Sequence, residues 1–174
     1  MRTFRLLTEP EIECRVSEIA KTGQYLKLLL YKTARTDAAI LDETFGPLNW
    51  QNKYEVIDGK MYCSVGVKDP TTGEWIWKQN VGTESNMEAE KGQASDAMKR
   101  AGFVWGIGTE LYTAPDIKVP ADKCNIKQYG ERFKCYDRFT VEKIAYDESE
   151  SISGISILCN GKRCFVWQKN ADRG

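Results

Sequence analysis

The sequence has 174 residues, the usual length of one domain or slightly more, so one hydrophobic core is expected. Its 25 lysines and arginines balance its 25 aspartates and glutamates. The zero net charge excludes a polybasic, histone-like protein, so any affinity for nucleic acid must come from a local cluster of cations. The sequence contains no histidine, which excludes serine–histidine triads, cysteine–histidine pairs and histidine-ligated metals.

Targeting and membrane signals are missing from the sequence pattern. The first apolar run is too short for a signal peptide, and no window approaches the roughly 20 apolar residues of a membrane span. We therefore expect a cytoplasmic protein with no membrane partner. In that compartment the six cysteines are expected to be reduced thiols or metal ligands and not disulfides.

In the first part of the chain, the residue pattern predicts two helices, one before and one after an ambiguous segment. Thr8-Glu9-Pro10-Glu11 has the pattern of a capping box, and apolar residues follow at helical spacing, so a helix is predicted that ends near Gly23. The apolar run of residues 25–31 fits a buried strand or the start of a second helix. Residues 36–44 have helical composition, and Phe45-Gly46-Pro47 is expected to end that helix.

Three strands and a helix are predicted in the middle of the chain. The strands cover residues 50–57, 60–68 and 74–81, and the tight turn Asp58-Gly59 and a longer turn at residues 69–73 join them into an antiparallel meander. A helix is predicted at residues 86–101, capped by Ser85 or Asn86. Its inward face has small and apolar side chains, namely Met87, Ala94, Ala97, Met98 and Ala101.

In the last part of the chain, the residue pattern predicts strands and no helix. Pro115 and Pro120 mark an irregular connection, and residues 139–146, 154–159 and 162–167 follow as predicted strands, the last two joined at Asn160-Gly161. The expected fold is α+β, with an antiparallel β-meander packed on a helix as a β-β-β-α core. We expect this core at residues 1–115 and a small C-terminal β extension of the same globular unit at residues 116–174.

The order of these segments resembles the Rad52 superfamily of single-strand DNA annealing proteins, most closely its short bacteriophage members. The motifs that carry the resemblance are FGPLNW at residues 45–50, GKMYCSVGV at residues 59–67, GEWIW at residues 73–77 and EKGQASDAMKRAGFVWGIG at residues 90–108. The resemblance runs from about residue 25 to residue 112. Its most specific part is residues 94–101 followed by Gly106-Ile107-Gly108.

The resemblance implies a protein that anneals complementary strands without ATP in homologous recombination, forms homo-oligomeric rings or arcs, and holds single-stranded DNA in a basic groove. Lys99 and Arg100 match the family's paired cations that contact the phosphates. Lys60 matches a lysine of a secondary DNA site, and Arg35 lies near an arginine at the helix entry. No enzymatic activity, cofactor or metal is expected, and a host single-strand binding protein is a candidate further partner in a bacterial cytoplasm.

The meander also interleaves lysines with aromatic residues, a pattern typical of single-strand binding surfaces. Because side chains alternate between the faces of a strand, we assign DNA contact to Lys53 and Lys78 and packing to the rings. Two positions depart from the family: Phe103 replaces an arginine of the eukaryotic members, and Pro47 replaces an aromatic residue. These departures affect the expected path of the DNA.

Other interpretations of the same residues remain open. Lys99 and Arg100 could form a basic last helical turn that complements the helix dipole. Asp116-Ile117-Lys118 has the spacing of a nuclease motif, with Asp96 as a second acid, although the flanking prolines disfavour a central catalytic strand. The alternatives to annealing are therefore a module that coats single-stranded DNA without pairing it and, less favoured, a metal-dependent nuclease.

Four cysteines gather in the last third of the sequence: Cys124, Cys135, Cys159 and Cys164. Four thiolates could bind zinc tetrahedrally and stabilise a small β module. No pair has the tight C-x2-C spacing of a zinc knuckle, so metal-free thiols packed as small apolar side chains are the favoured interpretation.

Overall fold

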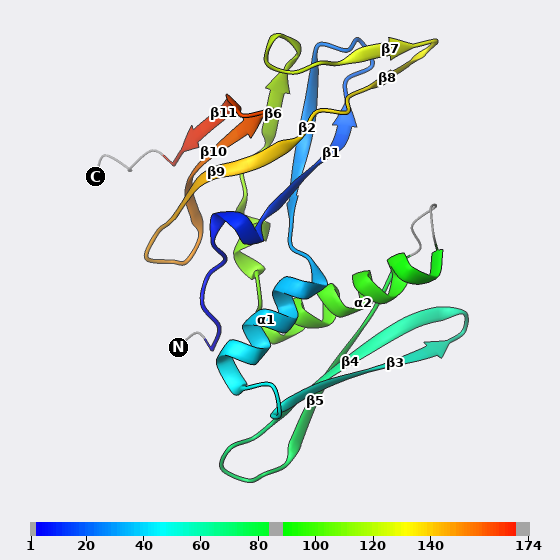
Figure 1. The fold of residues 1–174 in the computed structure, drawn as a ribbon, viewed down its shortest axis with the longest axis vertical. Coiled ribbons are helices and arrows are strands. Elements are labelled where there is room, and N and C mark those ends of the chain that lie inside the picture. The colour runs from blue at the N-terminus through cyan, green and yellow to red at the C-terminus, as the bar shows by residue number, and fades with distance from the viewer. Residues whose placement is uncertain (1–2, 84–88, 170–174) are drawn as a thin grey trace. The chain divides into compact units, whose positions relative to one another are not determined.

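The computed structural model describes residues 3–83 and 89–169, and its contacts divide the chain into two compact units. Unit 1 comprises the residues up to Leu6 together with Lys32–Thr109, and unit 2 comprises Leu7–Tyr31 together with the chain from Glu110 onward. Antiparallel sheet is present in both units, and helices α1 and α2 lie in unit 1, so the expected α+β class is confirmed (Figure 1). No helix in the described ranges is long and apolar enough to cross a membrane.

Helix α1 (Ala34–Phe45) of unit 1 has caps at both ends. At its start, the backbone N–H of Thr36 donates to the Thr33 side chain at 3.3 Å. At its end, Gly46 has a φ of 82°, a backbone conformation that favours glycine. The predicted helix and its end at Gly46 are confirmed.

The meander of unit 1 consists of β3 (Trp50–Ile57), β4 (Lys60–Lys68) and β5 (Trp75–Val81), in the order β3-β4-β5. Asp58 and Gly59 turn the chain with φ angles of 50° and 73°, as a primed two-residue hairpin turn requires. The three predicted strands and this turn are confirmed.

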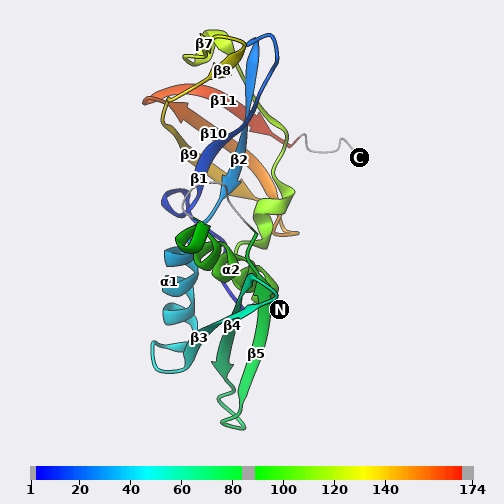
Figure 2. The same cartoon turned by 90° about the vertical axis from the view of Figure 1, so that its right-hand side faces the viewer.

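Helix α2 (Ala89–Trp105) packs on β4 and β5 and also contacts α1 (Figure 2). Ala97, Met98 and Ala101 are buried, as their helical spacing predicts. The helix continues beyond the predicted end at Ala101 to Trp105. The predicted caps at Ser85 and Asn86, and Met87 of the predicted face, lie outside the described residues.

Unit 2 contains a six-stranded antiparallel sheet in the order β11-β10-β9-β1-β2-β6. Its strands are β1 (Glu13–Ile19), β2 (Tyr25–Tyr31), β6 (Ile117–Pro120), β9 (Phe139–Tyr146), β10 (Ile152–Cys159) and β11 (Lys162–Gln168). The edge strands β6 and β11 also contact each other, so the sheet curves around an apolar core. The predicted strands at β9, β10 and β11 are confirmed. A separate hairpin is formed by β7 (Lys127–Tyr129) and β8 (Arg132–Lys134), which the sequence pattern did not predict.

The predicted first helix is wrong. The capping box at Thr8 and Glu11 is present, but it starts only the 3-10 turn Glu9–Glu11, and the chain then enters β1. Strand β1 pairs with β2, whose Leu26, Leu28 and Leu30 are buried. Because β1 pairs with β2 from Glu13 to Ile19, strand pairing overrides the helical spacing, and the ambiguous segment at β2 is a strand.

The units differ from the predicted division at residue 115. Strand β1 lies between β9 and β2 in one sheet, with Glu13 opposite Thr140. Residues 7–31 therefore belong to the same unit as the C-terminal strands. Strands so distant in the sequence carry no local signal that they pair.

Candidate nucleic-acid interface

Lys99 and Arg100 lie within α2, before its last turn. The helix continues to Trp105, and its last turn contains no basic residue. A charge interacts with the helix dipole mainly within the terminal turn. The interpretation of these two cations as a dipole-complementing last turn is therefore wrong.

One carboxylate organises this pair. Asp96 Oδ2 accepts a hydrogen bond from Arg100 Nε at 2.8 Å, and Asp96 Oδ1 lies 3.7 Å from Lys99 Nζ. Thr83, just after β5, donates to the same carboxylate from its backbone N–H at 2.9 Å and from its hydroxyl at 3.0 Å. Partial burial alone would raise the pKa of Asp96, but the hydrogen bonds from Thr83 and Arg100 hold it below its ordinary value. The two cations thus share the carboxylate of Asp96.

Lys78 faces α2 from the meander. It lies opposite the fully buried Val65, on the face of the sheet that packs against the helix. Its ammonium donates to the Val104 carbonyl at 3.3 Å and lies 4.4 Å from the ring centre of Trp105. Lys78 therefore fastens the end of α2 to β5.

Lys53 and Lys60 lie on the opposite face of the meander. The register places Lys53 opposite Ser64, and Lys60 shares the side of β4 on which Ser64 lies, since side chains alternate along a strand. The Lys53 ammonium lies 4.6 Å from the ring centre of Trp77. That ring packs directly on Gly66, where a Cβ would lie 2.7 Å from it.

The structure therefore divides the predicted DNA-binding residues. Lys78, Lys99 and Arg100 gather along α2, Lys53 and Lys60 share the outer face of the meander, and Arg35 is exposed in the first turn of α1. The sequence pattern identified cations of unit 1 but did not show that they form two surfaces.

A buried ion pair lies beneath Lys99, and sequence reasoning missed it. Lys32 and Asp37 are both fully buried. The Lys32 ammonium donates to Asp37 at 2.5 Å and to the Lys99 carbonyl at 3.0 Å, and lies 4.0 Å from the ring centre of Phe103. Lys32 thus joins α1 to the backbone of α2 at Lys99. Phe103, the residue that departs from the family, contacts this cation.

Burial disfavours the ionised form of Asp37, and the charge of Lys32 only partly offsets this effect. Burial raises the pKa of Asp37 to about 6, against the opposing effect of the Lys32 charge. Its Oδ2 is a buried oxygen that finds no hydrogen-bond partner in the described part of the chain. Gly102 makes the close approach of α1 and α2 possible, because a Cβ at that position would collide with the Asp37 carboxylate. A lysine directly after an apolar run gave no sequence signal of this role.

Two acids of the nuclease interpretation are already engaged by cations. Asp116, just before the edge strand β6, lies 3.5 Å from Lys27 and 3.4 Å from Lys118. Asp96 is held by Thr83 and Arg100, as described above. In the described residues, neither carboxylate belongs to a group of three or more acidic or cysteine side chains that could hold a metal ion.

Two of the four C-terminal cysteines contact Asp137. Cys135 and Cys159 each donate to Asp137 Oδ2 at 3.4 Å, whereas Cys124 and Cys164 donate to backbone carbonyls at 3.4 Å. Burial raises the pKa of Cys124 and of Cys159 to about 12, so both thiols stay protonated. Within the part of the chain that the structure describes, no three cysteine or carboxylate side chains are placed to hold a metal ion. The metal-free state of these thiols stays a prediction.

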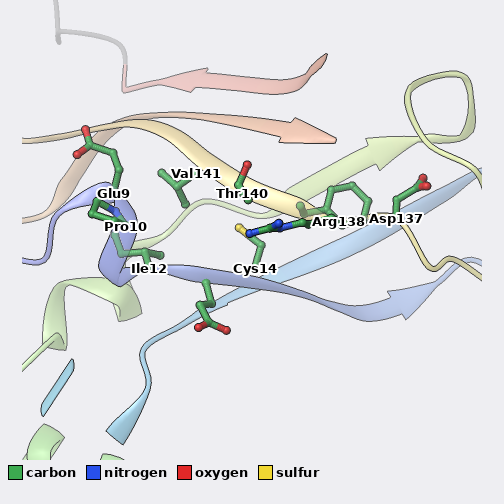
Figure 3. A pocket seen from close by; sticks show the side chains of 10 residues that line it. Glu9, Pro10, Ile12, Cys14, Asp137, Arg138, Thr140 and Val141 are labelled. Carbon is green, nitrogen blue, oxygen red and sulfur yellow. The ribbon is translucent and has the colours of Figure 1, made fainter. Parts of the chain in front are cut away.

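A cavity of about 490 Å³ lies beside β1 and β9 in unit 2. The two strands are paired at Glu13 and Thr140, and Glu9 Oε1 accepts a hydrogen bond from the Ile144 N–H at 3.3 Å. Figure 3 shows Arg138 reaching toward Cys14 among the lining residues. The cavity is the gap that this limited pairing leaves between the strands, and the site residues predicted from the sequence do not line it.

Comparison with protein families gives one match over most of the chain. The model of the Rad52/22 family, described as a double-strand break repair protein, matches residues 11–150. The match includes α1, the meander, α2 and most of the sheet of unit 2. Neither the curated proteins nor the solved structures gave a match.

Proposed function

Because the chain belongs to the Rad52/22 family of double-strand break repair proteins, we propose that it binds single-stranded DNA and anneals complementary strands without ATP. The observation that carries the proposal is the Lys99–Arg100 pair on α2, within the most specific motif of the family resemblance. Its side chains are partly exposed, at 25% and 43%, so they can reach a phosphate.

The chemistry needed for annealing is charge neutralisation, not bond breaking. Two complementary strands repel each other through their phosphates, and cations that replace counterions lower this repulsion. Contacts to phosphates leave the base edges free to pair. Asp96 lies 2.8 Å from Arg100 Nε and 3.7 Å from Lys99 Nζ, so one carboxylate positions both cations on the same part of α2.

The backbone beneath these cations is fixed. Lys32, just before α1, donates to the Lys99 carbonyl, Asn80 donates to the Arg100 carbonyl at 3.4 Å, and Lys78 donates to the Val104 carbonyl. An α-helix held at three successive points along its length presents its cations in one geometry. Preorganisation of this kind lowers the entropy lost on binding.

The meander supports assembly into a homo-oligomer. Its outer strands β3 and β5 are both sheet edges, and they carry large exposed apolar side chains: Tyr54, Val56, Ile57, Trp75, Ile76 and Trp77. Edge strands with exposed apolar residues favour pairing with a further chain. A ring or arc would align many subunits along one strand and raise the local concentration of its bases. The short bacteriophage type and an encounter with a host single-strand binding protein in a bacterial cytoplasm belong to the same proposal.

The decisive experiment follows two complementary labelled oligonucleotides without ATP or magnesium. We expect the protein to accelerate duplex formation. Light scattering should show an oligomer of defined mass. Binding without acceleration would instead identify a coating module. Loss of strands on addition of magnesium would identify a nuclease.

A further inference from the structure

The β7–β8 hairpin of unit 2 has two chemically different faces. Cross-strand partners point to the same face of a sheet, and the register pairs Lys127 with Lys134, Gln128 with Phe133 and Tyr129 with Arg132. Three cations and a tyrosine therefore share one face, while Gln128 and Phe133 lie on the other. Tyr136 contacts the ring of Tyr129 edge-on at 6.4 Å and so extends the first face. We call this surface the hairpin face: Lys127, Tyr129, Arg132, Lys134 and Tyr136.

The opposite face anchors the hairpin to its unit. Phe133 packs on Gly23, in the turn between β1 and β2, where a Cβ would lie 2.6 Å from its ring. At the base, Asp137 accepts hydrogen bonds from the Asn125 backbone N–H at 2.6 Å and from the Asn160 amide at 2.8 Å. Since Phe133 faces the unit, the hairpin face is turned away from this contact. Figure 1 shows the hairpin beyond the end of the sheet, next to the turn that joins β1 and β2.

The side chains of the hairpin face are open to solvent. Tyr129 is 51% exposed and Tyr136 is 75% exposed, and the three cations are exposed as well. The Lys134 ammonium lies 5.9 Å from the ring centre of Tyr129. Among the described residues, the cations of this face form no ion pair with an acidic side chain, and Glu131 of the turn is the acid nearest to them in the sequence.

This arrangement does not serve the stability of the fold. Lys127 and Lys134 are directly opposite each other, and like charges in that position destabilise a strand pair. A tyrosine exposed to this extent gains little from burial. An anionic ligand would relieve the repulsion, and a ligand with flat faces would use the rings.

We propose that the hairpin face is a second contact for single-stranded DNA, separate from the cations of α2. An unpaired strand offers both complementary chemistries, since its phosphates match the cations and its unstacked bases match the tyrosines. A duplex offers phosphates but hides its base faces. The inference rests on the proposed single-strand binding of the protein and adds a place for the strand that the family motifs do not cover.

The test compares two matched double variants of the full chain. Lys127→Ala with Lys134→Ala removes the facing lysines, and Lys143→Ala with Lys162→Ala removes two exposed lysines elsewhere in unit 2. Binding of a labelled oligo-dT strand is measured against salt. Two lost phosphate contacts should lower the slope of log affinity against log salt by about 1.4, because each contributes about 0.7 for a single strand. The control variant should keep the parental slope.

A second variant tests the tyrosines. Tyr129→Leu with Tyr136→Leu should weaken oligo-dT binding about tenfold or more, because base stacking on an aromatic ring contributes substantially to each contact. Its salt slope and its affinity for duplex DNA should stay unchanged. Oligo-dT carrying 5-iodouracil should crosslink to Tyr129 or Tyr136 of the parent protein on irradiation.

The outcomes separate this inference from the proposed function. A parent that anneals strands, with hairpin variants that bind as it does, would overturn the inference and leave the proposed function intact. Equal losses for single strands and duplexes, with no effect of the tyrosine variant, would also overturn it, since the face would then be a general polyanion surface. Polyglutamate that competes as well as oligo-dT would assign the face to an acidic protein instead.

Discussion

On α2, Lys99 and Arg100 share the carboxylate of Asp96, whereas on the hairpin face Lys127 and Lys134 oppose each other without an acidic partner in the described residues. The backbone of the α2 pair is held by Lys32 and by Asn80 of β5, and the hairpin is held from its rear face and its base. The difference separates two ways of building a basic surface. The α2 pair has a fixed side-chain geometry, and Asp96 offsets part of its positive charge. The hairpin lysines keep their full charge and more conformational freedom.

The largest expected effect comes from removing the α2 pair. Lys99→Ala with Arg100→Ala should abolish annealing, with a salt slope for oligo-dT shallower by about 1.4 per subunit. Folding should lose little, since a partly exposed ion pair contributes about 0.2–1 kcal/mol. Annealing rates and urea unfolding measure the two effects.

A control variant makes this result specific. Lys143→Ala on β9 removes an exposed lysine outside the family-like motifs and should leave annealing unchanged. If the double variant anneals as fast as the parent, the α2 pair is not the site, and the hairpin face becomes the stronger candidate for the main contact.

The second effect concerns the support beneath the α2 pair. Lys32→Met leaves the Asp37 carboxylate buried without its cation and removes the hydrogen bond to the Lys99 carbonyl. Removing one partner of a buried pair costs about 3–5 kcal/mol, which urea unfolding would measure. Lys32→Met combined with Asp37→Leu should recover most of that loss. A single variant as stable as the parent would show that the ion pair does not join the helices.

The third effect is the pH dependence that Asp37 of unit 1 contributes to stability. The pKa of Asp37 is raised to about 6 by burial, above its ordinary value of 3.8. A group with a raised pKa in the folded state contributes stability that is full below its unfolded pKa and is lost as the pH rises through the folded pKa. The difference in unfolding free energy between the parent and Asp37→Asn should therefore change between about pH 4 and pH 6. A difference that stays constant across this window would contradict the raised pKa.

The fourth effect is a small gain in stability, opposite in sign to the loss expected for Lys32→Met. Lys127→Ala with Lys134→Ala should stabilise the protein by about 0.2–1 kcal/mol, because it removes a like-charge pair across the hairpin. The same substitution is expected to weaken DNA binding. A gain in melting temperature together with a loss of affinity would identify these lysines as binding residues kept at a cost in stability. A loss of stability would show that they help to hold the hairpin.

The smallest expected effect tests whether hydrogen bonds or a zinc ion hold the base of the hairpin. If the hydrogen bonds to Asp137 are sufficient, protein purified without chelator should contain well under one zinc per chain. Addition of a chelator should then leave the melting temperature unchanged. A stoichiometric zinc content would make Cys124, Cys135, Cys159 and Cys164 a metal site.

Much of unit 1 could be predicted because its signals are local. The turn at Asp58 and Gly59 needs a backbone that few residues adopt easily, and Gly46 ends α1 for the same reason. The small residues of α2 repeat at helical spacing and mark its buried side. The cations at Lys99 and Arg100 were found through a motif, and their surroundings were not.

Unit 2 shows where local reasoning fails. Thr8 and Glu11 form the predicted capping box, yet no long helix follows, because β2 and β9 pair with β1 on either side. The β7–β8 strands are only three residues long each, too short for a periodic pattern to stand out. Their shared face becomes visible only through the register.

The meander, the two helices of unit 1 and the C-terminal strands can be inferred from the sequence alone, as can the family, because tight turns, helical spacing and ordered motifs depend on neighbouring residues. Tertiary structure decided that residues 7–31 join the C-terminal sheet and that Lys32 is buried with Asp37 under Lys99. It also decided that the predicted lysines lie on two faces of the meander. These features depend on which distant segments meet, and a buried lysine or a paired strand is stable only when its partner supplies the opposite charge or the hydrogen bonds that water would otherwise provide.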